Sequence, residues 1–265
     1  MSLLQIKNCS LSFGGVKALQ HFSAELNAGE ILGIIGPNGA GKTTLFNILT
    51  GVYPPDTGEI LFKNEAIQAK TPHQINHFGI ARTFQNIRLF SELTVEDNVK
   101  IAFHQHLHSS LFQSAFQSAS FLKEENEITR KTQILLSLFH LESRSEEQAK
   151  NLPYGDQRKL EIVRALATQP QLLLLDEPAA GMNRTEKKEL VELILRIQKD
   201  FHLAILLIEH DMSVVMNLAP RIIVLDYGEK IAEGSPEEIR KNKKVIEAYL
   251  GTDETHPLLG YPQGD

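Results

Sequence analysis

The stretch Gly36-Pro37-Asn38-Gly39-Ala40-Gly41-Lys42-Thr43-Thr44 decides the fold of this chain. It fits the pattern of Gly, four residues, Gly-Lys and then Ser or Thr that forms a phosphate-binding loop. Apolar residues 31–35 before it are typical of a buried parallel strand, and residues 45–49 after it have apolar side chains at helical spacing. This order of strand, loop and helix disfavours the alternative, a glycine turn beside a surface lysine. The sequence predicts a nucleoside triphosphate site.

The residue types of the loop suit phosphate chemistry. Glycines let the backbone turn tightly, so that its N–H groups converge on phosphate oxygens at the positive end of a helix. Lys42 can reach the β- and γ-phosphates as a mobile charge, and the Thr43 hydroxyl can ligate Mg²⁺.

The composition narrows the class of protein. Its 265 residues suffice for one large domain or two small ones, and the net charge of −6 argues against a broad nucleic-acid surface. The single cysteine, Cys9, cannot form an internal disulfide and favours a reducing compartment. The longest apolar runs, such as residues 203–208, are too short to span a bilayer, and no signal peptide is evident. We expect a cytosolic protein that meets a membrane only through a partner.

Strands and helices follow in a pattern that predicts two layers around the loop. Residues 3–35 and a strand at 59–67 give an antiparallel layer. Further along, the expected elements are a helix at 72–78, a strand at 80–85, a helical region from Thr94 to about Leu141 with a loop or insertion at 107–120, helices at 157–168 and 184–199, strands at 172–175, 203–208 and 222–225, a hairpin at 226–228, short helices from Ser235 and a tail at 252–265. Such alternation indicates a parallel sheet covered on both faces.

The apolar strand predicted at 172–175 is followed by two acids, Asp176 and Glu177. Ligands of open α/β sheets bind at the carboxyl ends of the strands, so these acids are expected to lie near the bound phosphates. Asp176 is predicted to hold Mg²⁺, usually through water, and Glu177 to activate the attacking water as general base. A strand followed by a capped turn is the structural alternative. His210, just past the next core strand, is placed to bond the γ-phosphate, although a lone histidine at a strand end is often only structural.

Two other groups have competing interpretations. Phe13, on a glycine-flanked loop, is either an adenine-stacking ring or a core side chain. His104, His106 and His108 could suggest a metal site, but no cysteine or patterned carboxylate accompanies them, which favours a solvated helix end.

Together, Phe13, residues 36–44, Gln85, residues 152–157, residues 172–177 and His210 resemble the ATP-binding subunit of an ABC transporter. The resemblance covers nearly the whole chain. It implies that ATP is the nucleotide, that Phe13 stacks on adenine, and that Gln85 senses Mg²⁺ and the γ-phosphate while facing a membrane partner. It further implies that the signature stretch, residues 152–157 with Tyr154, Gly155 and Asp156, binds the γ-phosphate held by a second subunit, and that residues 179–183 cross the dimer interface.

Two departures from the family pattern carry information. The common signature Leu-Ser-Gly-Gly-Gln is here Leu152-Pro153-Tyr154-Gly155-Asp156, so the serine hydroxyl is missing and the Gly155 N–H and the helix start remain as anion donors. Asn183 stands where many relatives have Asp. This signature variant, with residues 178–183, resembles the subgroup of branched-chain amino acid uptake systems, whose relatives include urea and short-chain amide importers.

The resemblance implies a P-loop NTPase (RecA-like) α/β core with an antiparallel β subdomain and a helical subdomain. The expected single domain spans residues 1–250, with 1–90 and 158–250 as β subdomain and core, 91–157 as helical subdomain, and 251–265 as tail.

The expected function is ATP hydrolysis that drives a branched-chain amino acid importer. The implied partners are transmembrane permease subunits, a second ATP-binding subunit (identical or not) and, indirectly, a periplasmic or extracellular solute-binding protein, at the cytoplasmic face of the inner membrane. The alternatives are a urea or amide importer, a lipid or lipopolysaccharide exporter, and a soluble cassette ATPase acting on ribosomes or DNA.

Overall fold

The computed structural model describes residues 2–103 and 119–250, which form two compact units. One unit consists of Met1–Arg82 and Gln171–Asp265, and the other of Thr83–Pro170. The second unit contains the signature stretch, residues 152–157, and the helix predicted at 157–168, whereas the sequence analysis predicted a boundary between residues 157 and 158. The three candidate histidines, residues 107–118 of the expected insertion and the tail lie outside the described residues.

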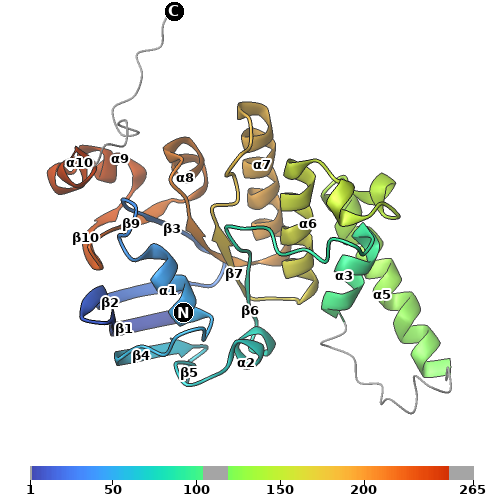
Figure 1. The fold of residues 1–265 in the computed structure, drawn as a ribbon, viewed down its shortest axis with the longest axis horizontal. Coiled ribbons are helices and arrows are strands. Elements are labelled where there is room, and N and C mark those ends of the chain that lie inside the picture. The colour runs from blue at the N-terminus through green and yellow to red at the C-terminus, as the bar shows by residue number, and fades with distance from the viewer. Residues whose placement is uncertain (1, 104–118, 251–265) are drawn as a thin grey trace, which may run out of the picture. The chain divides into compact units, whose positions relative to one another are not determined.

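An antiparallel sheet in the first unit confirms the predicted layer (Figure 1). Its strand order is β2-β1-β4-β5, with β1 Ser2–Phe13, β2 Val16–Asn27, β4 Thr57–Phe62 and β5 Glu65–Ala66. The single strand expected at 59–67 is wrong, because the chain reverses at Lys63 and Asn64, with φ of 54° and 64°. Positive φ at two successive residues is the geometry of a tight hairpin turn.

The second sheet of this unit carries the phosphate-binding loop. Its order is β10-β9-β3-β8-β7-β6, with β3 Ile31–Ile35, β6 Ile80–Arg82, β7 Leu172–Asp176, β8 Ala204–Ile208, β9 Arg221–Asp226 and β10 Glu229–Gly234. β10 is antiparallel to β9, and the other pairs are parallel. Every residue of β3, β7 and β8 is buried, as expected for strands covered on both faces.

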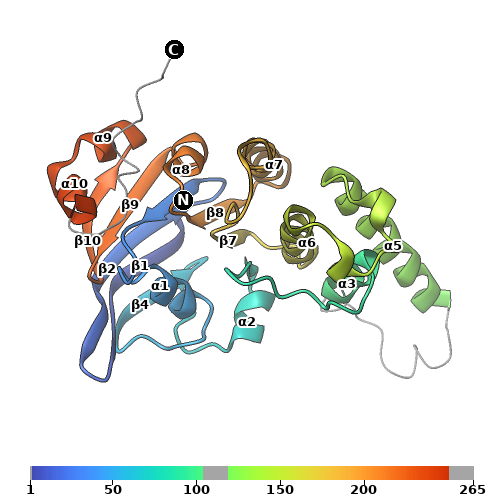
Figure 2. The ribbon, with the colours of Figure 1, turned by 45° about the horizontal axis from the view of Figure 1, so that its top comes forward.

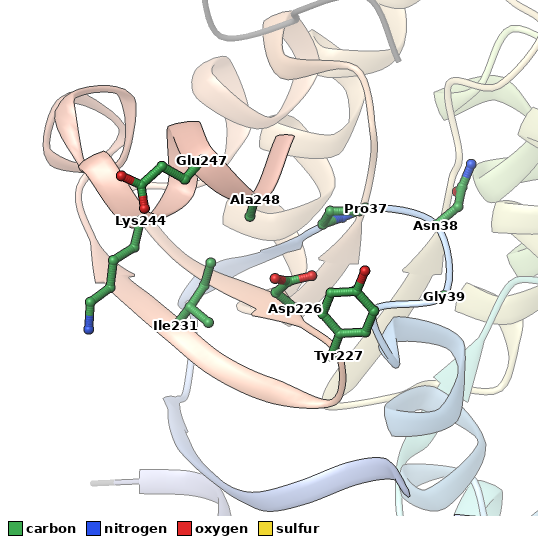
Figure 3. A pocket seen from close by; sticks show the side chains of 10 residues that line it. Pro37, Asn38, Gly39, Asp226, Tyr227, Ile231, Lys244, Glu247 and Ala248 are labelled. Atoms are coloured by element: carbon green, nitrogen blue, oxygen red, sulfur yellow. The ribbon is translucent and has the colours of Figure 1, made fainter. Parts of the chain in front are cut away.

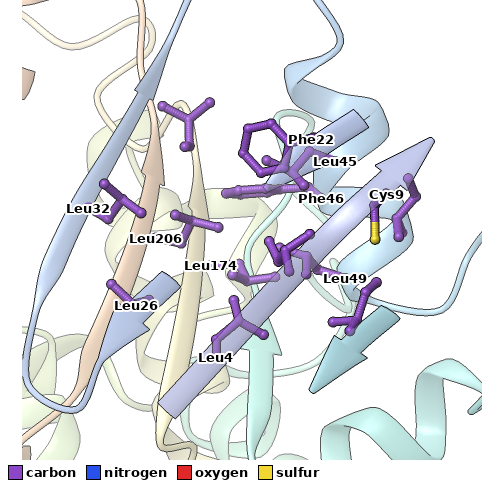
Figure 4. Packing of buried hydrophobic residues seen from close by; sticks show 14 of the residues in the cluster. Leu4, Cys9, Phe22, Leu26, Leu32, Leu45, Phe46, Leu49, Leu174 and Leu206 are labelled. Carbon is purple, nitrogen blue, oxygen red and sulfur yellow. The ribbon is translucent and has the colours of Figure 1, made fainter. Parts of the chain in front are cut away.

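Apolar side chains between the two sheets form the core of this unit. Leu4 and Leu26 of the antiparallel sheet pack with Leu32, Leu174 and Leu206 of the parallel sheet (Figure 4). Helix α1, Lys42–Leu49, adds Leu45, Phe46 and Leu49 to the same cluster. The core therefore anchors the base of the phosphate-binding loop on both sides.

The part of the first unit that the structure describes has five further helices, of which all but α10 follow a strand of the two sheets (Figures 1 and 2). They are α2 Pro72–His77, α7 Arg184–Phe201, α8 Met212–Leu218, α9 Pro236–Lys241 and α10 Lys243–Leu250. Capping boxes at Thr71 and Asn183 explain where α2 and α7 begin, because each satisfies amide groups that have no partner within the helix.

The second unit is helical in its described residues (Figure 2). It consists of α3 Val95–Phe103, α5 Ala119–Leu138, the short 3₁₀ helices η2 Glu142–Arg144 and η3 Ala149–Asn151, and α6 Tyr154–Ala167. Helix α6 begins at Tyr154 rather than at the predicted Gln157, because Pro153, with φ of −54° and ψ of 151°, is not helical and forms the N-cap. No described helix is both long and apolar enough to cross a membrane.

The strand expected at 80–85 ends at Arg82. The next residues do not continue the sheet, since the Phe84 N–H donates to the side chain of Glu161 instead of a neighbouring strand.

Candidate functional site

The phosphate-binding loop joins β3 to α1 in a conformation that needs glycine. Gly36 has a φ of 153°, and a Cβ there would lie 2.1 Å from the backbone oxygen of Leu225. Gly41, the N-cap of α1, has a φ of 101°, and a Cβ there would lie 2.4 Å from the backbone oxygen of Ala18. Both neighbours are backbone atoms, of β9 and of β2, so neither position tolerates a side chain.

Lys42 is buried against the loop that it belongs to. Its ammonium donates to the backbone oxygens of Gly36 and Pro37 at 2.6 and 2.8 Å. The charge is therefore already held at the centre of the loop, where the sequence predicted that it meets phosphate. Thr43, the next residue, is exposed in the first turn of α1.

The sheet order brings the predicted acids to the same edge as the loop. Strand β8 lies between β3 and β7, and Ile208 pairs with Ile34 on one side and with Asp176 on the other. Because these strands are parallel, the loop after β3, Asp176 and Glu177 after β7 and His210 after β8 share one carboxyl edge. This is the edge where ligands of open α/β sheets bind.

Asp176 is buried and forms an ion pair that the sequence analysis missed. Its Oδ2 accepts from Nη2 of Arg82 at 2.7 Å, and the two side chains are 4% and 6% exposed. Arg82 also donates to Oδ1 of Asn47 in α1 at 2.8 Å. A basic residue at the end of a buried strand was the available signal, but nothing in the sequence named its partner.

Glu177 and His210 are brought together, as predicted for neighbouring groups of one site. Oε2 of Glu177 lies 3.6 Å from Nδ1 of His210, and the Glu177 carboxylate raises the pKa of His210. Glu177 has a φ of 48°, and its N–H donates to the backbone oxygen of Ile208 at 2.9 Å. Strand β8 thus fixes a strained turn that points the acid toward the histidine.

Glu209 is a second residue that sequence reasoning missed. It is 1% exposed, and burial raises its pKa. Its carboxylate accepts the N–H of Ala179 at 2.8 Å and the N–H of His210 at 3.2 Å. This acid therefore connects the loop after Glu177 to the loop that carries His210. An acid directly after an apolar strand was the only sequence signal.

Phe13 is a surface residue, not a core residue. It is 43% exposed at the end of β1, and its ring makes a T-shaped contact with the ring of Tyr53, at a centroid distance of 5.1 Å and an interplanar angle of 73°. The core-packing interpretation is therefore wrong. Its role in binding a base stays a prediction, to which the structure adds Tyr53 as an exposed aromatic neighbour.

The other predicted residues belong to the second unit. Gln85 is exposed just beyond Arg82, and Tyr154, Gly155 and Asp156 form the first turn of α6. The signature stretch therefore does present a helix N-terminus, which is the anion donor expected in place of the missing serine hydroxyl. The carboxylate of Asp156 pairs with Lys159 at 3.5 Å within α6.

The oxygen donors at the sheet edge are of the type that binds Mg²⁺. The described residues contain no group of three or more His, Cys, Asp or Glu that could hold a metal ion. Mg²⁺ needs only one or two protein oxygens because it keeps several waters and binds phosphate. The hydroxyl of Thr43 and the carboxylate of Asp176 meet that requirement.

A cavity of about 440 Å³ borders the phosphate-binding loop on another side. It lies between the loop at Pro37–Ala40, the β9–β10 turn with Asp226 and Tyr227, and helix α10 with Lys244 and Glu247 (Figure 3). Residues 37–40 of the phosphate-binding loop line it, whereas Lys42, Asp176 and Glu177 do not.

Comparison with known families decides the identity of this arrangement. The sequence model of the ABC transporter family matches residues 19–180. The chain belongs to the ABC transporter family. A second model, described as branched-chain amino acid ATP-binding cassette transporter, matches residues 229–255, which run from β10 into the C-terminal part of this ABC protein.

Individual relatives place the chain among the ATP-binding cassettes of the family. It is 46% identical, over 94% of its length and 98% of the relative, to the high-affinity branched-chain amino acid transport ATP-binding protein LivG of Escherichia coli. It is 41% identical, with the same coverage, to the protein BraF of Pseudomonas aeruginosa, which carries the same description. The solved ADP conformation of an ATP-binding cassette of an ABC transporter is 33% identical, with a TM-score of 0.83 over 95% of this chain and all of that one. The family and the fold predicted from the motifs are confirmed.

Proposed function

We propose that this chain binds Mg·ATP at the carboxyl edge of its parallel sheet and hydrolyses it to power an ABC importer for branched-chain amino acids. One observation carries the chemical part of the proposal, namely that loop 36–44, Asp176, Glu177 and His210 share one edge around strand β8. The similarity to LivG and BraF over nearly the whole chain supports the transport part.

The phosphates occupy the loop in this proposal. Backbone N–H groups at the start of α1 and the ammonium of Lys42 bind them, which requires Lys42 to exchange its bonds to Gly36 and Pro37 for bonds to phosphate oxygens. Phe13 stacks on the adenine. Catalysis is then mainly positioning and electrostatic stabilisation of the charge that develops on the transferred phosphoryl group.

The remaining site residues bind Mg²⁺ or act on the attacking water and the γ-phosphate. Thr43 and Asp176 hold Mg²⁺, which supplies positive charge at the phosphates when bound, and Gln85 senses it. Glu177 takes a proton from the attacking water as general base, and His210 orients the γ-phosphate. The contact between Glu177 and His210 supports this division, because it holds the base next to a group that donates hydrogen bonds.

The transporter context includes partners. The signature stretch at Tyr154 binds the ATP of a second cassette, and permease subunits hold the dimer at the cytoplasmic face of the inner membrane. A solute-binding protein delivers the amino acid to the permease from outside.

Two substitutions test the chemical part, with matched controls on the exposed face of α7. Lys42→Ala should abolish ATP binding, whereas Lys188→Ala should not. Glu177→Gln should keep ATP binding and slow hydrolysis by about a hundredfold or more, whereas Glu189→Gln should hydrolyse normally. Normal turnover in Glu177→Gln would reject it as the base.

A reconstitution tests the transport part. The chain is purified with the membrane proteins that it binds and placed in vesicles, and uptake of leucine, urea and a short-chain amide is measured with ATP on the cassette side. Uptake of leucine alone supports the proposal. Uptake of urea or amide, export of lipid, or purification with ribosomes or DNA would replace it with the corresponding alternative.

A further inference from the structure

Two charged residues of α6 are buried at the loop that contains Gln85. Arg158 and Glu161 are each 3% exposed, lie one helical turn apart and form an ion pair at 3.5 Å. Buried charges persist only when their hydrogen-bonding capacity is satisfied. In this unit, the backbone of residues 84–88 supplies most of that satisfaction.

Arg158 holds the two carbonyl groups around Gln85. Its Nη1 donates to the backbone oxygen of Phe84 at 2.8 Å, and its Nη2 donates to the backbone oxygen of Gln85. A guanidinium that is planar and permanently charged binds two adjacent acceptors in a fixed geometry, which a lysine cannot reproduce.

Glu161 holds amide groups of the same loop. Its Oε1 accepts the N–H of Phe84 at 3.2 Å and the N–H of Arg88 at 3.4 Å. The loop is therefore fastened at both ends of the stretch 84–88, with its carbonyls on the cation and its amides on the anion. Hydrogen bonds to charged groups are about twice as strong as neutral ones.

The same arginine also reaches the signature stretch. Its Nη2 and Nε lie 2.7 and 3.1 Å from the hydroxyl of Tyr154, the first residue of α6. Tyr154 stands where the common signature has glycine, which has no side chain to make this contact. One guanidinium thus touches both the residue that opens the signature helix and the backbone of Gln85.

We propose that Arg158 and Glu161 are positioning residues that fasten loop 84–88 to the signature helix, so that Gln85 and Tyr154 move as one rigid piece. The inference rests on the proposed function, in which Gln85 senses the nucleotide of its own subunit and Tyr154 that of the partner. Under it, the ion pair links the response to one ATP with the response to the other.

Hydrogen exchange of the full-length chain tests the fastening. Glu161→Gln removes the charged acceptor, so exchange in peptides covering residues 84–88 should rise about tenfold or more, while peptides of β7 stay unchanged. Glu127→Gln is the matched control, because Glu127 pairs with Lys131 on the exposed side of α5 in the same unit. Equal exchange at 84–88 in wild type and Glu161→Gln would overturn the proposal.

Three further variants keep the test decisive if Glu161→Gln does not fold. Tyr154→Phe removes only the hydroxyl from an exposed ring and should raise exchange at 84–88 by about threefold. Arg158→Lys keeps the positive charge but cannot bind both carbonyl groups. Its exchange rate at residues 84–88 should lie between those of the wild type and Arg158→Met. Unchanged exchange in these variants would overturn the role of Arg158.

Kinetics test whether the fastening matters for the reaction. Glu161→Gln should lower kcat for ATP hydrolysis by about tenfold or more while leaving the affinity for a fluorescent ATP analogue unchanged, since the phosphate-binding loop lies in the other unit. A loss of folded protein would instead reduce the number of binding sites. An unchanged kcat in Glu161→Gln would overturn the proposal. A wild type without ATPase activity would instead overturn the proposed function, and the fastening of loop 84–88 would then be judged by hydrogen exchange alone.

Discussion

Substitutions of Arg82 and Asp176, which form a buried ion pair, should have non-additive effects on the free energy of unfolding. We consider Arg82→Met, Asp176→Asn and the double variant, compared with the wild type in the absence of nucleotide and Mg²⁺. The charged atoms are 2.7 Å apart, and the side chains are 6% and 4% exposed. Water therefore cannot replace either partner once the other is removed.

The magnitude follows from this burial. Removing one partner of a buried ion pair leaves an uncompensated charge, which lowers the free energy of unfolding by about 3–5 kcal/mol. The double variant buries neither charge. Its free energy of unfolding should fall by about 2 kcal/mol, mainly because Oδ1 of Asn47 loses the hydrogen bond from Arg82. Each single variant therefore loses more stability than the double variant, and the coupling energy is at least about 4 kcal/mol.

Urea unfolding followed by circular dichroism measures all four proteins. The control is the exposed pair of Lys7 and Glu59, 3.0 Å apart with side chains 53% and 48% exposed, whose removal should change stability by less than about 1 kcal/mol. If the losses of the two buried single variants simply add in the double variant, the pair is not energetically coupled and the reasoning from burial fails.

Three further predictions concern backbone, pH and base binding. Gly36→Ala should lower stability by more than about 3 kcal/mol or prevent folding, because its Cβ would clash with backbone, whereas Gly39→Ala, in open space at a φ of 79°, should lose only about 1–2 kcal/mol in the same urea assay. Burial alone would raise the pKa of Asp211, but hydrogen bonds from Lys187 and Ser213 lower it from 3.8 to about 2. Its ionised form therefore stabilises the fold above about pH 4 by at most about 2 kcal/mol, and the stability difference from Asp211→Asn should shrink as pH falls from 4 toward 2. Phe13→Ala should weaken the binding of ATP by about 1–3 kcal/mol and leave the binding of inorganic triphosphate unchanged, as measured by calorimetry. An equal loss of affinity for both ligands would contradict stacking.

The sequence predicted the parallel sheet and its loop because their signals are local. A phosphate-binding pattern between an apolar run and a helical repeat needs no distant partner to be recognised. Asp176 and Glu177 at the end of β7 were found in the same way, since a change from leucines to acids marks the end of a buried strand.

Element ends were harder to predict, and each failure has a physical cause. The break at Lys63 and Asn64 uses two residues without glycine in the left-handed region, which composition does not reveal. The early end of β6 depends on Glu161, far away in the sequence, which takes the amide that would continue the ladder. Pro153 takes the N-cap position of α6, although proline is more familiar at the first helical position.

The charged residues that sequence reasoning missed share a property that no local pattern encodes. They are Arg82, Arg158, Glu161 and Glu209. Arginine and glutamate usually lie on the solvent-exposed surface, and they are buried only where partners for their charges are available. Three of these four residues bind backbone groups of loops, as Glu209 binds the N–H of Ala179. Spacing along the chain carries no record of such contacts.

These buried charges suggest how the site is prepared for its ligand. A buried charge lowers stability unless it is fully paired, so its retention calls for a compensating role. Lys42 holds its own loop, Glu209 holds the loops after β7 and β8, and Arg158 with Glu161 holds the loop at Gln85. In each case the charge fixes backbone that the proposed function places next to phosphate. Loops fixed in this way need less ordering when nucleotide binds, so a larger part of the binding energy is left to drive movement of the subunit.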